Sequence, residues 1–440
     1  MTTKRRLGLD LSPLRTSRDF RLVFIGGVVT AFGSFISYVT IPYQVAKLTN
    51  DPLMVGLIGV CELLPLLIMS FVGGALADYI DRRLLVRGSE LALALICGIL
   101  LINSLSKEPH LWLLYVAAFL TAGVAGLQRP ALEAMIPRLV KPEQLPATMA
   151  VQSLGMQFAQ LFGMPLAGIL LASFDLAWVY AFDLLTFVVS LICLTLVKAV
   201  PPPVAADRPS VKSVVTGLKY AKSRPELLGT YLVDINAMFF GMPSALYPFL
   251  ANDLGGPRVL GLLYAAPAVG SLIATIGSGW TARVHRHGLM VLIAAALWGV
   301  GIVGVGLSDT LWLTLFCLAF AGAADMVSGL FRMIIWNQTI PDHLRGRLAG
   351  IEMLSYTTGP LLGQLRAGAM ARTGLGVPGA IWVGGVLCVA GSLALAAALP
   401  KFVRYNGKDG MALKKAADDE WAATAAERSH SGSGSGSTDR

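Results

Sequence analysis

The chain has 440 residues, of which 55% are hydrophobic and only 14% are charged, and its formal net charge is +9. Soluble globular proteins contain about 25% charged residues and about 45–50% apolar residues, so the chain falls outside that range on both counts. Together with a mean hydropathy of +0.67, this excludes a soluble enzyme, a disordered chain and a disulfide-stabilised scaffold, and predicts an integral membrane protein.

The apolar runs predict an all-α membrane fold. They are long and do not alternate, which argues against a transmembrane β-barrel, and each has the roughly 20 residues that a helix needs to cross a bilayer. In chain order the twelve expected spans are 22–46, 53–77, 84–104, 111–136, 144–172, 176–199, 226–251, 258–282, 288–307, 311–338, 347–371 and 377–399.

The spans predict two six-helix bundles, 22–200 and 226–400, between a cytoplasmic N-tail (1–21) and a flexible cytoplasmic C-tail (401–440). The linker, 201–225, opens with three prolines and carries several basic residues, and its stretch 211–221 is compatible with a short helix on the membrane face. The first apolar stretch is too long for a cleavable signal, so we expect it to remain as a span. The five cysteines lie in apolar runs and are expected to be small buried hydrophobes.

The basic residues predict the orientation. With these spans, 28 of the 35 Lys and Arg residues fall on the side of the N-terminus and four on the other side. Because positive residues are retained on the cytoplasmic side, both termini are expected in the cytoplasm and the protein in the bacterial cytoplasmic membrane.

The two halves repeat one another. Residues 56–78 align without gaps to 261–283 at an offset of 205, and Arg129 corresponds to Arg332. Gly163-x4-Gly168 likewise corresponds to Gly363-x4-Gly368. Because six spans separate the copies, each repeat keeps its orientation, which predicts a pseudo-twofold axis along the membrane normal. A substrate is then expected between the halves, near the middle of the membrane.

A charged turn follows the second span and resembles the major facilitator signature between spans two and three. A glycine allows close helix approach, an aspartate can form an ion pair, and two arginines meet the anionic lipid surface. The expected gating residues are Gly74, Asp78, Arg82 and Arg83. Tyr79 and Asp81 depart from the family pattern, and a simple stop-transfer turn is the alternative.

The fifth span contains Gly163, Pro165 and Gly168, a degraded form of the antiporter motif of proton-coupled exporters. Glycine and proline at this spacing give a tightly packing helix that can kink. Ordinary close packing explains the same residues equally well.

Ionisable residues inside spans are costly and are therefore candidates for function. Carboxylates that could carry a coupling proton are Glu62, Asp234 and Asp325, with Asp183 and Glu352 also embedded. Residues that could bind substrate are Arg129, Glu133, Arg332 and Arg366. The first two are also spaced to pair on one helix, as Asp325 and Arg332 share a helix face. No phosphate-binding loop occurs and the histidines lie at span ends or in tails, so neither a metal site nor another cofactor is expected.

The strongest likeness to a known family lies in residues 234–251 and 260–270. Tyr247-Pro248-x-Leu-Ala251 followed by Gly261-x-Leu-Tyr264-Ala-Ala resembles the bacterial enterobactin-exporter branch of the major facilitator superfamily. That resemblance implies a proton-driven exporter of a siderophore or similar secondary metabolite working by alternating access. It also implies arginines for an acidic ligand and aromatic side chains for its rings.

Several alternatives remain open at this point. The same scaffold serves multidrug exporters and, less closely, nutrient importers, and a non-transporting receptor or scaffold could use the same fold. A membrane enzyme is disfavoured because no nucleophile and base are brought together. The expected partners are a small-molecule substrate, protons and the lipid bilayer, without nucleic acid, and the protein is expected to be a monomer.

Overall fold

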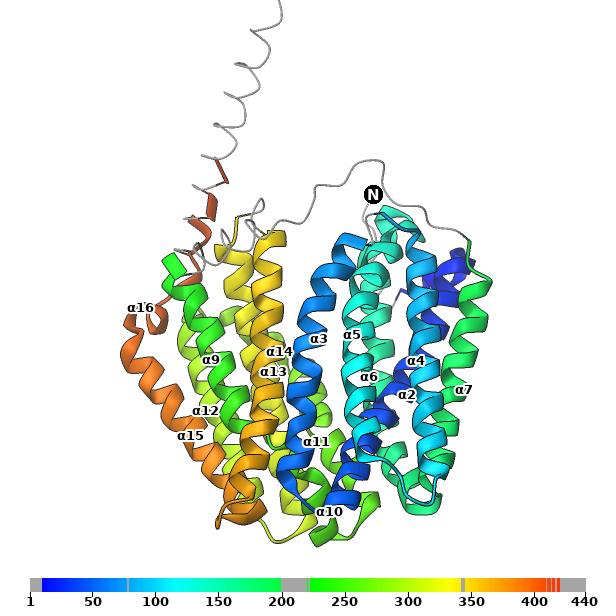
Figure 1. Ribbon diagram of the computed structural model, residues 1–440. Coiled ribbons are helices and arrows are strands. Elements are labelled where there is room, and N and C mark those ends of the chain that lie inside the picture. Colours follow the sequence, from blue (N-terminus) through cyan, green and yellow to red (C-terminus); the bar gives the residue numbers. More distant parts are fainter. Residues whose placement is uncertain are drawn as a thin grey trace, which may run out of the picture.

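The structure is a computed structural model that describes residues 10–76, 79–198, 220, 222–341, 345–408, 410–412, 414, 415, 418 and 419. Across these residues the chain is helical and contains no strand. Long helices stand side by side in two groups, and the short helices α1 and α16 lie toward the same end of the molecule (Figure 1). The predicted all-α membrane fold is confirmed.

The first group is formed by α2 to α7, preceded by the short α1 (Ser12–Thr16). Hydroxyl and carboxylate caps begin two of its helices: Ser17 accepts a hydrogen bond from the Phe20 amide, and Asp81 accepts one from the Arg83 amide. The helices are α2 (Arg18–Thr49), α3 (Pro52–Leu76), α4 (Arg82–Leu105), α5 (Leu111–Met135), α6 (Leu145–Ser173) and α7 (Leu176–Thr195), with 3-10 turns η1 (Ile136–Arg138) and η2 (Pro142–Gln144) between α5 and α6.

The second group is formed by α9 to α15 and ends in the short α16 (Pro400–Val403). Its helices are α9 (Pro225–Gly241), α10 (Tyr247–Leu254), α11 (Pro257–Ile276), α12 (His287–Leu307), α13 (Leu311–Thr339), α14 (Arg345–Ala371) and α15 (Gly376–Ala398), with 3-10 turns η3 (Ser244–Leu246) and η4 (Ser278–Arg283).

The seventh expected span is not one continuous helix. Met242 is extended, with φ −86° and ψ 110°, and it precedes Pro243, which lacks an amide hydrogen and disfavours helical geometry in the residue before it. The span is therefore divided into α9, η3 and α10. The eighth span is also shorter than expected, because α11 ends at Ile276 and η4 follows.

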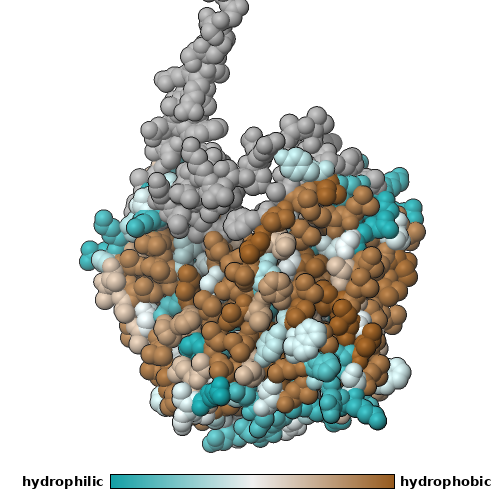
Figure 2. All heavy atoms as spheres, in the orientation of Figure 1, coloured by the Kyte–Doolittle hydropathy of each residue, from teal (hydrophilic) through white to brown (hydrophobic). Residues whose placement is uncertain are grey.

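Ten of the described helices are long and apolar enough to cross a membrane. The broken α9–α10 segment and α14, which contains several charged and polar residues, are not among them. The expected number of twelve spans thus depends on these two segments crossing the membrane with the other ten. A broad hydrophobic band, with hydrophilic residues above and below it, crosses the face of the molecule seen in Figure 2, as a lipid-facing surface requires.

The two bundles approach each other through glycines on α3, α6, α11 and α14. A Cβ added at Gly168 would lie 2.8 Å from the Gly261 nitrogen, and one at Gly56 would lie 2.6 Å from the Gln364 carbonyl oxygen. A Cβ at Gly368 would collide with the Pro52 backbone. Gly56 corresponds to Gly261 in the repeat, and Gly168 to Gly368, so the α3–α14 and α6–α11 contacts are built from the same two sequence positions.

These glycine contacts lie in the half of the molecule away from the termini. Gly56 is near the start of α3 and Gly368 near the end of α14, and both helix ends are remote from the N-terminus (Figure 1). Residues 1–9 of the predicted N-tail, most of the linker and the end of the C-tail fall outside the described residues, as does most of the short helix expected over 211–221. The rest of the predicted N-tail forms α1 and the start of α2.

Candidate functional site

A cavity of about 560 Å³ lies inside the first bundle, surrounded by α2, α3, α4, α5, α6 and α7. This volume falls within the range of about 300–1,000 Å³ that is usual for small-molecule sites. Its walls are mostly apolar, and among its lining residues are three carboxylates, Glu62, Glu90 and Asp183, but no lysine, arginine or histidine.

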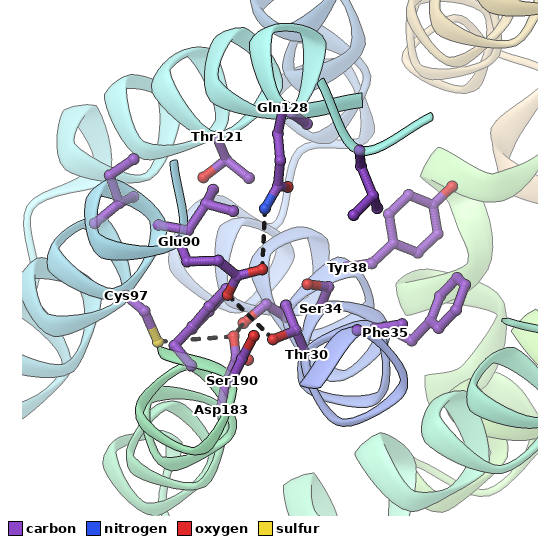
Figure 3. A pocket seen from close by; sticks show the side chains of 18 of the residues that line it. Thr30, Ser34, Phe35, Tyr38, Glu90, Cys97, Thr121, Gln128, Asp183 and Ser190 are labelled. Carbon is purple, nitrogen blue, oxygen red and sulfur yellow. Dashed lines mark hydrogen bonds between the residues drawn. The ribbon is translucent and has the colours of Figure 1, made fainter. Parts of the chain in front are cut away.

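Glu90, on α4, is 4% exposed and is held by neutral groups. Its Oε2 accepts a hydrogen bond from the Thr30 hydroxyl on α2 at 3.1 Å, and its Oε1 accepts one from the Gln128 amide on α5 at 2.9 Å (Figure 3). Three helices therefore converge on one carboxylate without supplying a positive charge.

Asp183, on α7, is 2% exposed and is also held by neutral groups. Its carboxylate accepts hydrogen bonds from the Ser37 hydroxyl on α2 and, at 3.3 Å, from the Thr186 hydroxyl, and the Cys97 thiol on α4 lies 3.7 Å away. The absence of a side chain at Gly33 makes room for it, since a Cβ there would collide with both Asp183 and Thr186.

The two carboxylates occupy successive layers of the bundle. Thr30 and Ser37 on α2 are seven residues apart, and so are Glu90 and Cys97 on α4, so each pair lies on one helix face two turns apart. At 1.5 Å per residue the layers are separated by about 10 Å. Glu90 lies nearer the end of the molecule that carries α1, and Asp183 nearer the opposite end.

Glu62, on α3, is the third carboxylate of the cavity, and it forms no hydrogen bond or ion pair with any other described residue. Another lining residue, Tyr38, packs edge-on against Tyr264 of α11 with the ring centroids 5.6 Å apart. The cavity wall is thus in direct contact with the second bundle.

The second bundle holds its carboxylate differently. Asp234 on α9 is 4% exposed and forms an ion pair with Arg332 of α13, and it also accepts a hydrogen bond from the Ser355 hydroxyl at 2.9 Å. Arg332 lies 3.8 Å from Asp325 as well. Arg332, Asp234 and Asp325 therefore form one cluster, which the sequence had indicated only for the two residues on α13.

Arg129 and Glu133 form an i,i+4 ion pair at 3.0 Å on α5, with more than half of each side chain exposed. The Arg129 guanidinium also lies 5.8 Å from the ring centroid of Tyr356 on α14. This contact joins the two bundles, and neither member of the ion pair lines the cavity.

Arg366 on α14 is directed toward the backbone of neighbouring helices rather than the cavity. It donates hydrogen bonds to the Phe239 carbonyl at 3.1 Å and the Ala380 carbonyl at 3.4 Å. It therefore ties α14 to α9 and α15.

The expected gating residues are only partly described. Asp78 lies outside the described residues, and Gly74 lies in α3. Arg82 donates a hydrogen bond to the Ala134 carbonyl at 2.9 Å, and Arg83 donates to the Leu194 and Thr195 carbonyls at 3.3 and 2.7 Å. These arginines thus bind the C-terminal carbonyls of α5 and α7, where positive charge is favourable.

The antiporter-like residues divide between two contacts. A Cβ at Gly163 would lie 3.1 Å from the Phe32 carbonyl oxygen of α2, within the first bundle, whereas Gly168 faces α11. Pro165 also lies at the α11 contact, because its Cα is 2.9 Å from the Cβ position of Gly261.

Sequence reasoning overlooked Glu90 and gave Asp183 no role. Glu90 lies nine residues into α4, so its position inside an apolar span was a usable signal. The hydroxyl groups at Thr30 and Ser37 gave a second signal, because they mark one face of α2 two turns apart. Among the described residues, no three His, Cys, Asp or Glu side chains gather as a metal site would require.

The sequence profile of the transmembrane secretion effector family matches residues 9–427. The enterobactin exporters EntS of Citrobacter koseri and Shigella boydii are each 29% identical to the chain over 370 residues, covering 82% of this chain and 87% of theirs.

Among solved structures, a nucleoside transporter NupG variant superposes with a TM-score of 0.70 at 11% identity, covering 88% of this chain and 99% of its own. An inward-facing bacterial homologue of the lysosomal transporter Spinster gives 0.67 at 13% identity, covering 88% and 95%. At these identities the likeness shows the fold. The chain therefore belongs to the transmembrane secretion effector family of major facilitator transporters, and it is a multi-pass membrane transporter rather than an enzyme.

Proposed function

We propose that this transporter exports an aromatic, polyhydroxylated small molecule of the siderophore type by alternating access, in exchange for protons. It would act in the bacterial cytoplasmic membrane with both termini in the cytoplasm. The naming of its relatives as enterobactin exporters supports the substrate class. The lack of a nucleotide-binding loop in the sequence supports a gradient as the energy source.

The observation that carries proton exchange is the cavity with three carboxylates and no basic residue among its lining side chains. An ionised carboxylate buried without a positive partner is costly, and binding a proton removes that cost. A proton is therefore the counter-ion that this arrangement favours.

The cavity suits the protonated form of a catechol better than its anion. Catechol hydroxyls can donate hydrogen bonds to carboxylates, and the apolar walls, with Phe35, Tyr38 and Phe187, can pack against aromatic rings. Arg129, Arg332 and Arg366 do not line this cavity. Their proposed contact with an acidic substrate would therefore need a conformation in which the bundles are rearranged.

Asp78 and its neighbours retain the proposed gating role. For Asp78 this role rests on the sequence motif, and Arg82 and Arg83, which belong to the same motif, hold the ends of α5 and α7. We expect Asp78→Asn to lower flux strongly while the protein remains in the membrane, measured as transport per transporter. Near-normal flux would remove the gating role.

A second candidate is the export of lipophilic cations. The same three carboxylates, without a basic neighbour in the lining, could bind a positive charge directly. This candidate shares the scaffold and the proton exchange but differs in the charge of the substrate.

The decisive experiment uses inverted membrane vesicles with an acidic interior and an internal pH-sensitive dye. Iron-free enterobactin or tetraphenylphosphonium is added outside, and vesicles without the protein serve as the control. If the vesicle interior becomes less acidic on adding enterobactin but not on adding tetraphenylphosphonium, the result supports the siderophore-type exporter. A response to the cation alone supports the second candidate. No response to either, with radiolabelled uptake also absent, contradicts both.

A further inference from the structure

Two buried carboxylates in the first bundle stand in a column of polar groups. Glu90 has Thr30 and Gln128 as donors, and Asp183 has Ser37 and Thr186. Ser190, seven residues after Asp183 on α7, lies beside the Glu90 layer in the cavity wall (Figure 3). The column therefore alternates carboxylates with hydroxyl groups along α2, α4 and α7.

The charges around this column are all negative or neutral. The titratable side chains that line the cavity are Tyr38, Glu62, Glu90, Cys97 and Asp183. No basic side chain faces either carboxylate from α2, α3, α4, α5, α6 or α7 among the cavity-lining residues. In the second bundle, by contrast, Asp234 is paired with the guanidinium of Arg332.

We propose that Glu90 and Asp183 are the proton-binding pair of this transporter and form a path through the first bundle. The proposal rests on the proposed proton exchange and assigns it to residues on α4 and α7. Asp183 takes up the proton near the end away from the termini, and Glu90 delivers it toward the end that carries α1.

Each transfer is a simple acid–base step. A carboxylate oxygen of Asp183 gains an O–H bond as a hydronium ion loses one and becomes water, and the Ser37 hydroxyl can rotate to accept or donate as the charge changes. Release of that proton to water in the cavity and its uptake by a Glu90 oxygen restores the Asp183 anion. The cavity is large enough for such water, and its hydroxyl and carboxylate groups supply hydrogen-bond partners.

The geometry also separates the two ends of the path. A gap of about 10 Å between the layers is too long for direct transfer between carboxylates. A substrate in the cavity would occupy the space that bridging water needs, so proton passage and substrate occupancy would exclude each other. Mutual exclusion of proton and substrate is one part of the coupling that an exchanger requires, and the alternating access proposed above supplies the other part by opening the cavity to one side at a time.

Infrared spectroscopy of the purified full-length protein in liposomes tests the assignment without any substrate. The C=O stretch of protonated carboxyl groups is recorded as the pH is lowered. Between about pH 8 and about pH 6, where exposed carboxylates stay ionised, Glu90→Gln and Asp183→Asn should each remove part of this band, and the double variant should remove the sum of the two parts. Glu108→Gln and Asp175→Asn, which change exposed carboxylates, are the matched controls.

A second measurement separates proton binding from folding. In variants that remain monodisperse, enterobactin uptake driven by a pH gradient should fall to the level of empty liposomes, whereas the control variants Glu108→Gln and Asp175→Asn should keep it. If the double variant keeps the band and Glu62→Gln or Asp325→Asn loses it, the assignment is overturned. If wild-type protein moves no enterobactin, the proposed function fails while the infrared result still decides the proton site.

Discussion

The two bundles share a fold and a repeated sequence, yet they stabilise buried carboxylates in opposite ways. The first surrounds Glu90 and Asp183 with hydroxyl and amide donors beside a cavity, whereas the second pairs Asp234 with Arg332. Glu90 and Asp183 have no positive partner among the cavity-lining residues, whereas Asp234 has one in Arg332. For this reason we assign the proposed proton binding to the first bundle.

The largest expected effect comes from breaking the ion pair of the second bundle. Arg332→Gln leaves Asp234 buried without a positive partner, which should lower the free energy of unfolding by about 3–5 kcal/mol. Thermal unfolding in detergent measures the loss. The double variant Asp234→Asn/Arg332→Gln should recover most of it, and a double variant as unstable as the single one would contradict this explanation.

A smaller effect is expected from crowding the Asp183 layer. A Cβ at Gly33 would collide with Asp183 and Thr186, so Gly33→Ala should destabilise the protein by about 1–3 kcal/mol. Gly27→Ala is the matched control, because no atom lies within 4 Å of its Cβ position on the same helix. It should be neutral or stabilise by up to about 1 kcal/mol through its better helix propensity. Equal effects of the two changes would show that Asp183 does not need the space.

Neutralising the carboxylates of the first bundle should affect stability less. In Glu90→Gln the amide oxygen can face Gln128 and the amide nitrogen can donate to the Thr30 hydroxyl, so the hydrogen bonds survive. The expected change in unfolding free energy is within about 1 kcal/mol. The same measurement on Asp183→Asn checks the second layer. If the free energy of unfolding fell by as much as is expected for Arg332→Gln, the proposed difference between the two bundles would be contradicted.

The smallest effect concerns the exposed contact between the bundles. Arg129 and Tyr356 should show a coupling energy of about 0.5–1 kcal/mol, because a cation–π contact at an exposed site is weak. A double-mutant cycle with Arg129→Gln and Tyr356→Leu measures it directly. A coupling of zero would mean that the contact contributes nothing to holding the bundles together in solution.

The sequence predicted the fold in detail because each span is encoded locally, by apolar length and by the residues that begin and end helices. Breaks within a span were harder to predict. Pro243 interrupts the seventh span, whereas Pro65, Pro165 and Pro267 lie inside continuous helices. A proline alone does not say which outcome the surrounding packing will select.

The candidate site was less predictable because its partners come from different helices. Arg129 and Glu133, or Asp325 and Arg332, could be related by helix spacing alone. The contact of Asp234 with Arg332 and that of Glu90 with Thr30 and Gln128 depend on how three helices pack, and no spacing encodes that. The spacing of residues along each span identifies the buried charged residues. It does not show which of them has a partner of opposite charge on another helix.

The paired glycine contacts bear on how this chain could have arisen. Position i of the first half contacts position j of the second half, and position j of the first half contacts position i of the second half. A twofold-symmetric homodimer has the same arrangement of contacts. A six-helix ancestor carrying one copy of each glycine could have formed both contacts by meeting a second copy of itself. Fusion of the two copies would then have left each half free to diverge, one pairing its buried carboxylate with an arginine and the other surrounding its carboxylates with neutral donors.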